Sequence, residues 1–270
     1  MTFSASADKR LFNVHTLENA RHRLWAHEAA DKPSGSLPGL HNRGQFVRQG
    51  EGRSKNSESA YHRLKVRLLR EPWAPGQLLQ IGVLAAELGT SATPVREALV
   101  RLATERLIVY RPKKGFLVKI LTEEELRELY FVSRMHLEAA LCCWQERAST
   151  GSNTPLDAKQ PIPTQGGRAT DLTDATEELM LRIAAESGID EITAMVSNIN
   201  DRLHRVRIAE QSVLLDHVVQ QVHGIDVWYA AADHEKLKDA IRCYHELRLQ
   251  RVRSICKELL SMAFTSTSSP

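Results

Sequence analysis

From Glu58 onward, apolar residues first recur at regular spacing along the chain, and this spacing is that of a helix. Apolar residues recur through 61–69 and stop before Pro72, which predicts a first helix of about three turns. A short apolar stretch at 81–88 predicts a second helix, and Gly89 is placed to terminate it. Two short helices in this order form the first part of a compact helical unit.

A third helix and a hairpin follow within a few residues. Thr93 is the expected N-cap and Pro94 the first helical residue, a position that tolerates the missing N–H of proline. Helical spacing predicts that one face packs inward, and this face carries Val95, Ala98, Leu99 and Leu102. Residues 108–110 and 116–118 predict two strands joined by the basic turn 111–115. Helix, helix, turn, helix and hairpin is the element order of a winged helix-turn-helix.

The remaining chain is helical in pattern, so the expected fold class is mainly α: an N-terminal winged helix-turn-helix with a small β-hairpin, followed by an all-α bundle. Thr122 is the expected cap of a helix reaching about Arg147, and residues 149–170 have the composition of a loop. Further helices are predicted at about 173–187, 190–212, 213–232 and 234–261. The predicted organisation is a disordered extension at 1–56, a first domain at 57–121, a helical domain at 122–262 and a disordered tail at 263–270.

The net charge of +3 hides an uneven distribution. Residues 57–121 carry 11 basic and 5 acidic side chains, whereas residues 122–270 carry 16 and 23. A basic small domain on an acidic body is typical of a protein that binds a polyanion. The chain has no apolar run of membrane-spanning length and no signal peptide, which predicts a cytoplasmic protein without a membrane partner. Its four cysteines lack a CxxC pair, so we expect them to be reduced and buried.

The third helix and the hairpin carry the side chains expected to contact DNA. Arg96 lies near the helix start, where a guanidinium can bind guanine or phosphate, and Ser91 and Thr93 can donate to phosphate oxygens. Lys113 and Lys114 occupy the hairpin tip, beside Gly115. Each residue also has an ordinary interpretation, as a helix cap, a solvated arginine or a charged turn. The predicted i, i+4 pair of Glu97 with Arg101 is one such surface feature.

These residues resemble a known family. The segment TPVREALVRLATERLIVYRPKKGFLV is similar to the DNA-binding domain of the GntR family of bacterial transcription regulators, and residues 129–138 resemble the start of its FadR-type, or FCD, effector domain. The resemblance implies a homodimer, held by its C-terminal domains, that binds a double-stranded DNA operator. The family usually reads SRTPVREAL where this chain reads SATPVREAL, so Ala92 replaces an arginine that contacts DNA.

FCD domains commonly hold a divalent metal ion through one aspartate and three histidines. The resemblance maps two of these ligands to His223, just before a helix, and to His245, but it places Thr176 and Met180 at the aspartate and the remaining histidine. Two imidazoles without a carboxylate bind a divalent ion weakly. We therefore favour cavity-lining, hydrogen-bonding roles for His223 and His245. A bound divalent metal ion is the less favoured alternative, and no other cofactor is predicted.

The helical domain is expected to bind a small metabolite, such as a carboxylate, through Arg134, His223 and His245, and so to modulate operator binding. A helix salt bridge between Arg134 and Glu138 is the ordinary alternative. The chain is not expected to be an enzyme, because a catalytic metal or carboxylate pair is missing at the required spacing. Two other functions stay open: an accessory DNA-binding protein of weak specificity, suggested by Ala92, and a metalloenzyme built on the two histidines.

Overall fold

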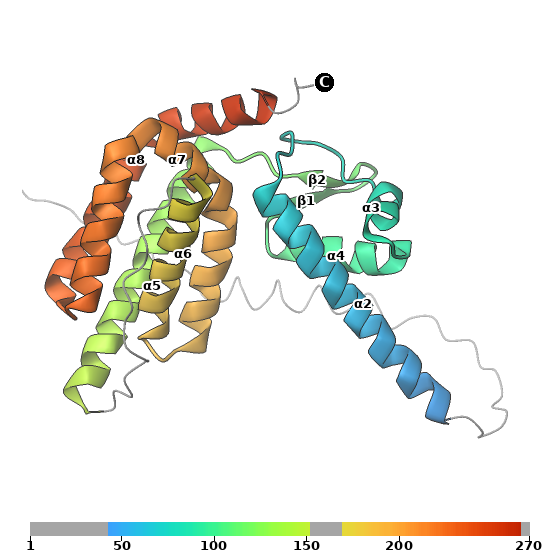
Figure 1. Cartoon of the computed structure of the whole chain (residues 1–270), viewed down its shortest axis with the longest axis horizontal. Coiled ribbons are helices and arrows are strands. Elements are labelled where there is room, and N and C mark those ends of the chain that lie inside the picture. The colour runs from blue at the N-terminus through green and yellow to red at the C-terminus, as the bar shows by residue number, and fades with distance from the viewer. Residues whose placement is uncertain (1–42, 152–168, 266–270) are drawn as a thin grey trace, which may run out of the picture. The chain divides into compact units, whose positions relative to one another are not determined.

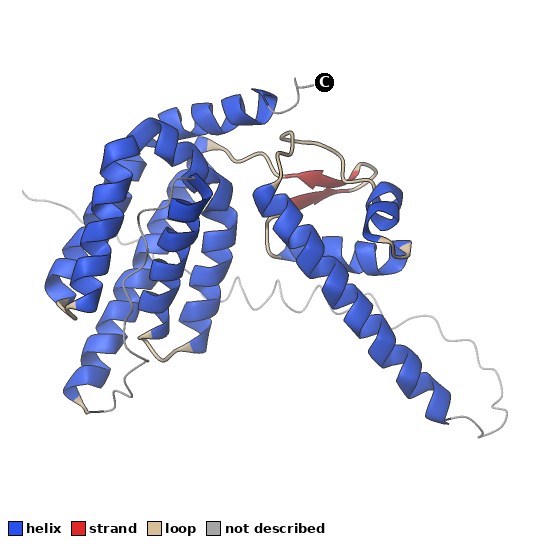
Figure 2. Cartoon of the chain, in the orientation of Figure 1, coloured by secondary structure: helices blue, strands red, loops and turns tan. Residues whose placement is uncertain are grey.

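The computed structural model describes residues 43–151 and 169–265. The N-terminal part contains helices α2 (Arg43–Arg70), α3 (Ile81–Leu88) and α4 (Ala92–Thr104), followed by strands β1 (Ile108–Arg111) and β2 (Gly115–Val118) (Figure 1). The strands pair antiparallel, with Ile108 opposite Val118. Figure 2 shows these strands as the small sheet beside the short helices. The predicted fold class, mainly α with a winged helix-turn-helix, is confirmed.

Helix α2 begins earlier than the sequence pattern indicated. It starts at Arg43, so residues 43–56 belong to a helix rather than to the predicted disordered extension. This segment is polar and contains three glycines, each of which lowers helix propensity, so its composition gave no signal for a helix. The rest of the predicted extension, residues 1–42, lies outside the described residues.

The turn between α3 and α4 follows the prediction at its start and departs from it at its end. Gly89 adopts the left-handed conformation with φ of 63°, and its N–H bonds to the end of α3, as expected for a C-terminal cap. Helix α4, however, starts at Ala92 with Ser91 as its N-cap, so the prediction of Thr93 as the cap is wrong. Pro94 is still in the first turn, where its missing N–H costs no hydrogen bond.

The hairpin is tight and has its basic residues at the tip. Lys113 has a φ of 66° and Gly115 a φ of 90°, so both residues lie in the left-handed region. The N–H of Lys114 donates to the carbonyl oxygen of Arg111 at 3.1 Å and closes the turn. Leu78 forms an isolated antiparallel bridge to Leu117, which adds a third short segment to the sheet. The wing is therefore a closed turn on a braced sheet.

The C-terminal part is built from the long helices α5 (Glu123–Ser149), α6 (Ala169–Ala185), α7 (Asp190–Ala230) and α8 (His234–Thr265). Thr122 caps α5 as predicted: its side chain accepts from the N–H of Glu125, and the Glu125 carboxylate accepts from the N–H of Thr122. This reciprocal pair is a capping box. It fixes the start of α5 a short distance along the chain from the end of β2.

Two predicted features of this part differ from the structure. Helix α7 runs without interruption from Asp190 to Ala230, so the predicted break at 212–213 is wrong. Gln211, beside the predicted break, is within the helix, and its side-chain amide donates to the hydroxyl of Thr173 at 3.0 Å. Helix α8 also continues to Thr265, three residues into the predicted tail, and most of the predicted loop, at 152–168, lies outside the described residues.

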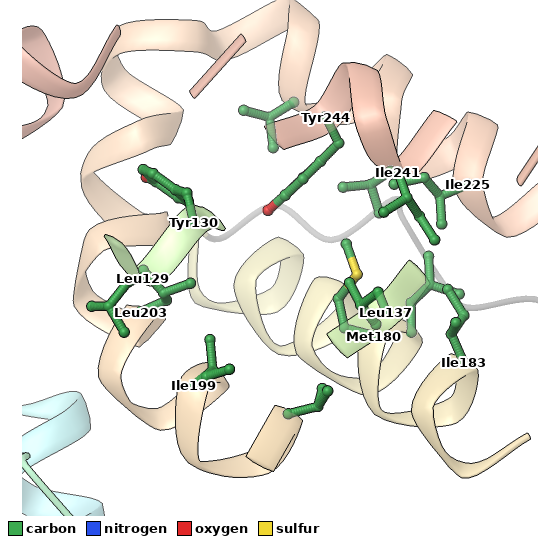
Figure 3. Packing of buried hydrophobic residues seen from close by; sticks show 14 of the residues in the cluster. Leu129, Tyr130, Leu137, Met180, Ile183, Ile199, Leu203, Ile225, Ile241 and Tyr244 are labelled. Atoms are coloured by element: carbon green, nitrogen blue, oxygen red, sulfur yellow. The ribbon is translucent and has the colours of Figure 1, made fainter. Parts of the chain in front are cut away.

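Two separate hydrophobic clusters form the cores. One contains residues between Ala60 and Val118, including the whole predicted inward face of α4, of which no residue is more than 1% exposed. The other joins α5 to α8, and Figure 3 shows its aliphatic side chains packed around Met180, Tyr130 and Tyr244. No helix among the described residues is long and apolar enough to cross a membrane. The four cysteines are free, but only Cys256 is buried, contrary to the expectation for Cys142, Cys143 and Cys243.

Candidate DNA interface and buried polar core

The predicted DNA-contacting residues of α4 are all accessible. Ser91 and Thr93 at the start of the helix and Arg96 one turn later have exposed side chains, whereas Val95 and Leu99 between them are buried. Helical periodicity thus holds one face of α4 in the core and leaves the other free. Ala92 is also exposed, so the small side chain at this position is not imposed by packing.

The wing presents its cations in the same accessible manner. Lys113 and Lys114 are exposed and Gly115 is partly exposed. Arg111, at the end of β1, is exposed as well and was not singled out by the sequence pattern. The tip therefore carries three positive charges within four residues.

The exposed cations of α4 and the wing differ in their ion pairing from Arg101, which also lies on α4. Among the described residues, Arg96, Lys113 and Lys114 take part in no ion pair, whereas Arg101 binds Glu58 at 2.8 Å and Glu105 at 3.2 Å. Arg101 also stacks on the ring of Tyr61. The predicted pairing of Arg101 with Glu97 is therefore replaced by these contacts. An exposed cation without a protein partner is available to a phosphate or a base edge.

The core of the helical part contains a buried ion pair. Arg248 of α8 and Glu210 of α7 are 0% and 1% exposed, and Nε of Arg248 donates to Glu210 at 2.7 Å. Tyr130 of α5 donates to the other oxygen of Glu210. Arg248 also donates to the side chain of Gln221 and the carbonyl oxygen of Tyr244, both at 2.8 Å. Burial and the Glu210 carboxylate hold the pKa of Tyr130 well above its ordinary value.

A second buried arginine, Arg207 of α7, lies next to this pair. Its guanidinium donates to the side chain of Asn200 at 2.9 Å and to Glu177 of α6 at 3.0 Å. Although burial opposes the charged form, interactions with Tyr244, Glu177 and Glu210 raise the pKa of Arg207 above its ordinary value. Both arginines therefore remain charged inside the bundle.

His245 of α8 lies among these cations and is itself buried. Its Nδ1 lies 2.8 Å from the carbonyl oxygen of Ile241, which assigns the ring proton to Nδ1. Nε2 then accepts from the hydroxyl of Ser133 on α5 at 3.1 Å. Burial, together with the positive charges of Arg248, Arg207 and Arg134, lowers the pKa of His245 to about 3. His245 is thus neutral and has both ring nitrogens in hydrogen bonds.

Arg134 of α5 is the third cation that interacts with His245. Its side chain is 22% exposed, and its Nε and Nη1 lie 3.7 Å from Glu138 and 3.9 Å from Glu246. The predicted pairing with Glu138 is therefore present, but it is longer than a hydrogen bond. Arg134 combines a loose surface ion pair with a position near the buried arginines.

Residues 56–118 match the model of bacterial regulatory proteins of the gntR family. The chain is 30% identical to the Nta operon transcriptional regulator of Aminobacter aminovorans over 146 residues, which cover 53% of this chain and 70% of that protein. The chain belongs to the gntR family. As a gntR-family protein it is a DNA-binding transcriptional regulator, and its relatives are regulators rather than enzymes.

Other relatives agree with this assignment. The HTH-type transcriptional regulator McbR of Escherichia coli K12 is 28% identical over 193 residues, covering 69% of this chain and 76% of McbR. A solved structure of a putative transcriptional regulator GntR from Rhodococcus sp. RHA1 has the same fold, with a TM-score of 0.55 at 19% identity; the likeness covers 74% of this chain and 98% of that one. The FCD subtype of this gntR-family chain stays a prediction.

The metal site implied by the FCD resemblance does not fit this gntR-family chain. His223 is exposed on α7 and lies inside that helix, not before it as predicted, whereas His245 is buried on α8. Thr176 and Met180 face the interior, but the thioether and the hydroxyl are weak ligands, and that hydroxyl donates to the carbonyl oxygen of Leu172. Three guanidinium groups near His245 also oppose a divalent cation.

A different group of potential ligands, Asp174, Glu177 and His204, lies between α6 and α7, with ligand atoms within 4.8 Å of one another. Glu177 already accepts from Arg207 at 3.0 Å and faces Nδ1 of His204 at 3.1 Å. Because the guanidinium already supplies a positive charge to Glu177, we describe this cluster as an ion-pair network rather than a metal centre.

Sequence reasoning missed Arg207, Glu210 and Arg248, although a signal was present. Arg207 and Glu210 follow the buried residues Leu203 and Val206 at helical spacing, so they fall on the inward face of α7. Arg248 lies four residues after the buried Tyr244 on α8. Charged residues in phase with an apolar face are the pattern that would have identified this regulator's buried core.

Proposed function

We propose that this regulator binds a specific DNA operator through residues 57–121 and that a small metabolite bound within residues 122–262 modulates this binding. In this proposal, α4 enters the major groove and the wing contacts the flanking backbone, which is how winged helix-turn-helix elements are used. The observation that carries the proposal is the set of exposed cations on α4 and the wing that have no ion-pair partner among the described residues.

The contacts divide into two kinds. Arg96 reads a base edge in the groove, whereas Ser91, Thr93 and the wing residues 113–115 bind phosphates and set the register. A homodimer on two half-sites follows from the family resemblance and gives an operator with two-fold symmetry. The effector binds near Arg134 and His245; His223 is left out because its side chain is exposed.

The test compares two arginines of the same helix. Fluorescence anisotropy with DNA from the regulator's own promoter and with random duplex would be measured for Arg96→Ala and for Arg101→Ala. We expect Arg96→Ala to weaken operator binding by about 1–3 kcal/mol while random DNA changes much less. Arg101, held by Glu58 and Glu105, is the matched control and should change operator affinity little.

An equal loss on both duplexes for Arg96→Ala would make Arg96 a phosphate contact and remove its role in specificity. Unchanged binding of both would exclude Arg96 from the DNA interface.

A second candidate function, an accessory DNA-binding protein of weak specificity, is favoured by one observation, the alanine at position 92. Footprinting separates the two functions. A protected site at one promoter supports the operator-specific regulator, whereas uniform binding that falls steeply with salt supports the accessory protein.

A further inference from the structure

A cavity of about 110 Å³ lies where the DNA-binding part, the connection after β2 and the helical part meet. These segments belong to one compact unit of the chain. Leu68 and Trp73 line the cavity from the DNA-binding part, residues 119–121 line it from the connection, and α7 and α8 line it from the helical part. Arg134 and His245 do not line it, so the cavity is distinct from the effector site proposed above.

Polar contacts hold α7 beside this cavity. Lys65 of α2 pairs with Asp201 of α7 at 2.5 Å, and Nη1 of Arg205 donates to the carbonyl oxygen of Trp73 at 3.2 Å. The ring of Trp73 is buried, and its Nε1 donates to the carbonyl oxygen of Arg67 at 3.0 Å. The cavity wall is therefore built from side chains that have defined partners.

The charge lining the cavity is unbalanced. Arg106, Arg202 and Arg205 line it, and none of them forms an ion pair within the part of the chain that the structure describes. Asp201, an acid that also lines the cavity, is already paired with Lys65. Burial lowers the pKa of Arg202 and of Arg205, and the nearby Arg106 adds to this effect at Arg202. Because a half-buried cation without an acid is poorly stabilised, an anion bound here would be favourable.

We propose that this cavity binds a short aliphatic monocarboxylate, such as butyrate, with its carboxylate at Arg202 and Arg205 and its alkyl chain against Leu68 and Trp73. The two arginines lie three residues apart on α7, a spacing that places both side chains on the same face of the helix. Guanidinium groups match the planar geometry of a carboxylate. This site goes beyond the proposed function, because it lies outside the region around Arg134.

The volume of the cavity limits the size of the ligand. An apolar cavity of roughly 150 Å³ in another protein holds a benzene ring, so a cavity of about 110 Å³ accommodates a smaller apolar group. An alkyl chain of about three or four carbons meets this limit. The apolar lining disfavours a second charged group on the ligand, which would have to leave water without a partner.

The position of the cavity gives the ligand a means of affecting DNA binding. Lys119, Ile120 and Leu121 connect β2 to α5, and all three line the cavity. Lys119 also pairs with Glu125 in the first turn of α5 at 3.0 Å. A ligand that contacts this connection and α7 changes DNA affinity to the extent that it binds the free and the DNA-bound protein differently.

The experiment measures binding of butyrate to the full chain by calorimetry, without DNA and at matched ionic strength. We expect butyrate to bind at least tenfold more tightly than acetate, which has a single methyl group as its apolar part. Butylamine has the same alkyl chain with the opposite charge, so we expect no measurable binding of it. Butyrate should also change the tryptophan fluorescence of the chain, and Trp73→Phe should remove that change because Trp73 lines the cavity.

Two arginine variants and one matched control locate the site. Arg202→Gln and Arg205→Gln should each weaken butyrate binding tenfold or more. Arg253→Gln removes an exposed arginine of α8 that does not line the cavity, and it should leave butyrate binding unchanged. Circular dichroism checks the fold of each variant. If Arg205→Gln, which loses the bond to Trp73, does not fold, Arg202→Gln decides the outcome.

Several results would overturn the site. These are equal binding of butyrate and acetate, binding of butylamine as tight as that of butyrate, or equal butyrate binding by wild type and the arginine variants. Butyrate binding that is lost in Arg134→Gln but kept in Arg202→Gln would also overturn it, and would support the effector site of the proposed function instead. DNA affinity is measured separately: butyrate binding at the cavity that leaves DNA affinity unchanged supports the site and overturns its effect on DNA binding.

Discussion

Arginine is used in opposite ways in the two parts of this molecule. Arg96 is exposed on α4 and has no ion-pair partner among the described residues, whereas Arg248 is fully buried and bonded to Glu210, Gln221 and Tyr244. Solvent stabilises the charge of Arg96, so the protein need not supply an acid for it. Arg248 has lost that solvent, and its surroundings must replace it. The environment therefore decides whether an arginine is available to a ligand in solvent or is held within the core.

The strongest test of this difference removes a buried partner. Arg248→Met leaves Glu210 buried without its cation, and we expect a loss of about 3–5 kcal/mol in the free energy of unfolding, measured by urea denaturation. Arg242→Met, on the exposed side of α8, should change the same quantity by no more than about 0.5 kcal/mol. The double variant Arg248→Met with Glu210→Leu should recover much of the loss. A loss below about 1 kcal/mol in Arg248→Met would contradict a tightly coupled pair.

A smaller effect is expected when a free cation is added to the DNA-binding part. Ala92→Arg restores the side chain usual in the family at an exposed position, so stability should change little while DNA affinity rises by about 1–3 kcal/mol. Anisotropy titrations of wild type and variant on promoter DNA provide the measurement. Ala92→Gln controls for side-chain length without charge. If the arginine gives no gain on any duplex, the start of α4 faces away from DNA in the complex.

The smallest effect concerns the wing. The double variant Lys113→Gln and Lys114→Gln removes two cations that would neutralise phosphates, so the slope of log affinity against log salt should become shallower by about 0.9 for each phosphate that is no longer neutralised. Titrations at several salt concentrations measure this slope. The same substitutions at the exposed Lys236 and Lys238 of α8 provide the control. An unchanged slope would exclude the wing from phosphate binding.

The sequence predicted the DNA-binding part better because its signals are local. The inward face of α4 could be read from helical spacing, and Gly89 marked the end of α3. The cap of α4 was misplaced because Thr93 stands before Pro94, and proline was assigned to the first helical position when it occupies the third. Such an error of two residues leaves the predicted exposed face unchanged.

The helical part was harder to predict because its features depend on long-range contacts. Arg248 and Glu210 lie 38 positions apart; their helical phase indicates that both face inward, but the sequence does not show that they pair with each other. His223 was expected to line a cavity together with His245, but a continuous α7 turns it outward. Helical periodicity over the whole of α7 determines the face of the helix on which each residue lies. A family resemblance gives only the position of that residue along the chain.

The left-handed backbone of Lys113 sets the charge of the wing tip against its conformational stability. For a residue with a Cβ atom this conformation costs about 1 kcal/mol, which a glycine would not incur. Lys113→Gly would therefore relieve the backbone strain, but the tip would keep two positive charges instead of three. If the tip binds phosphates as proposed, the charge of Lys113 therefore comes at a small cost in the stability of the wing.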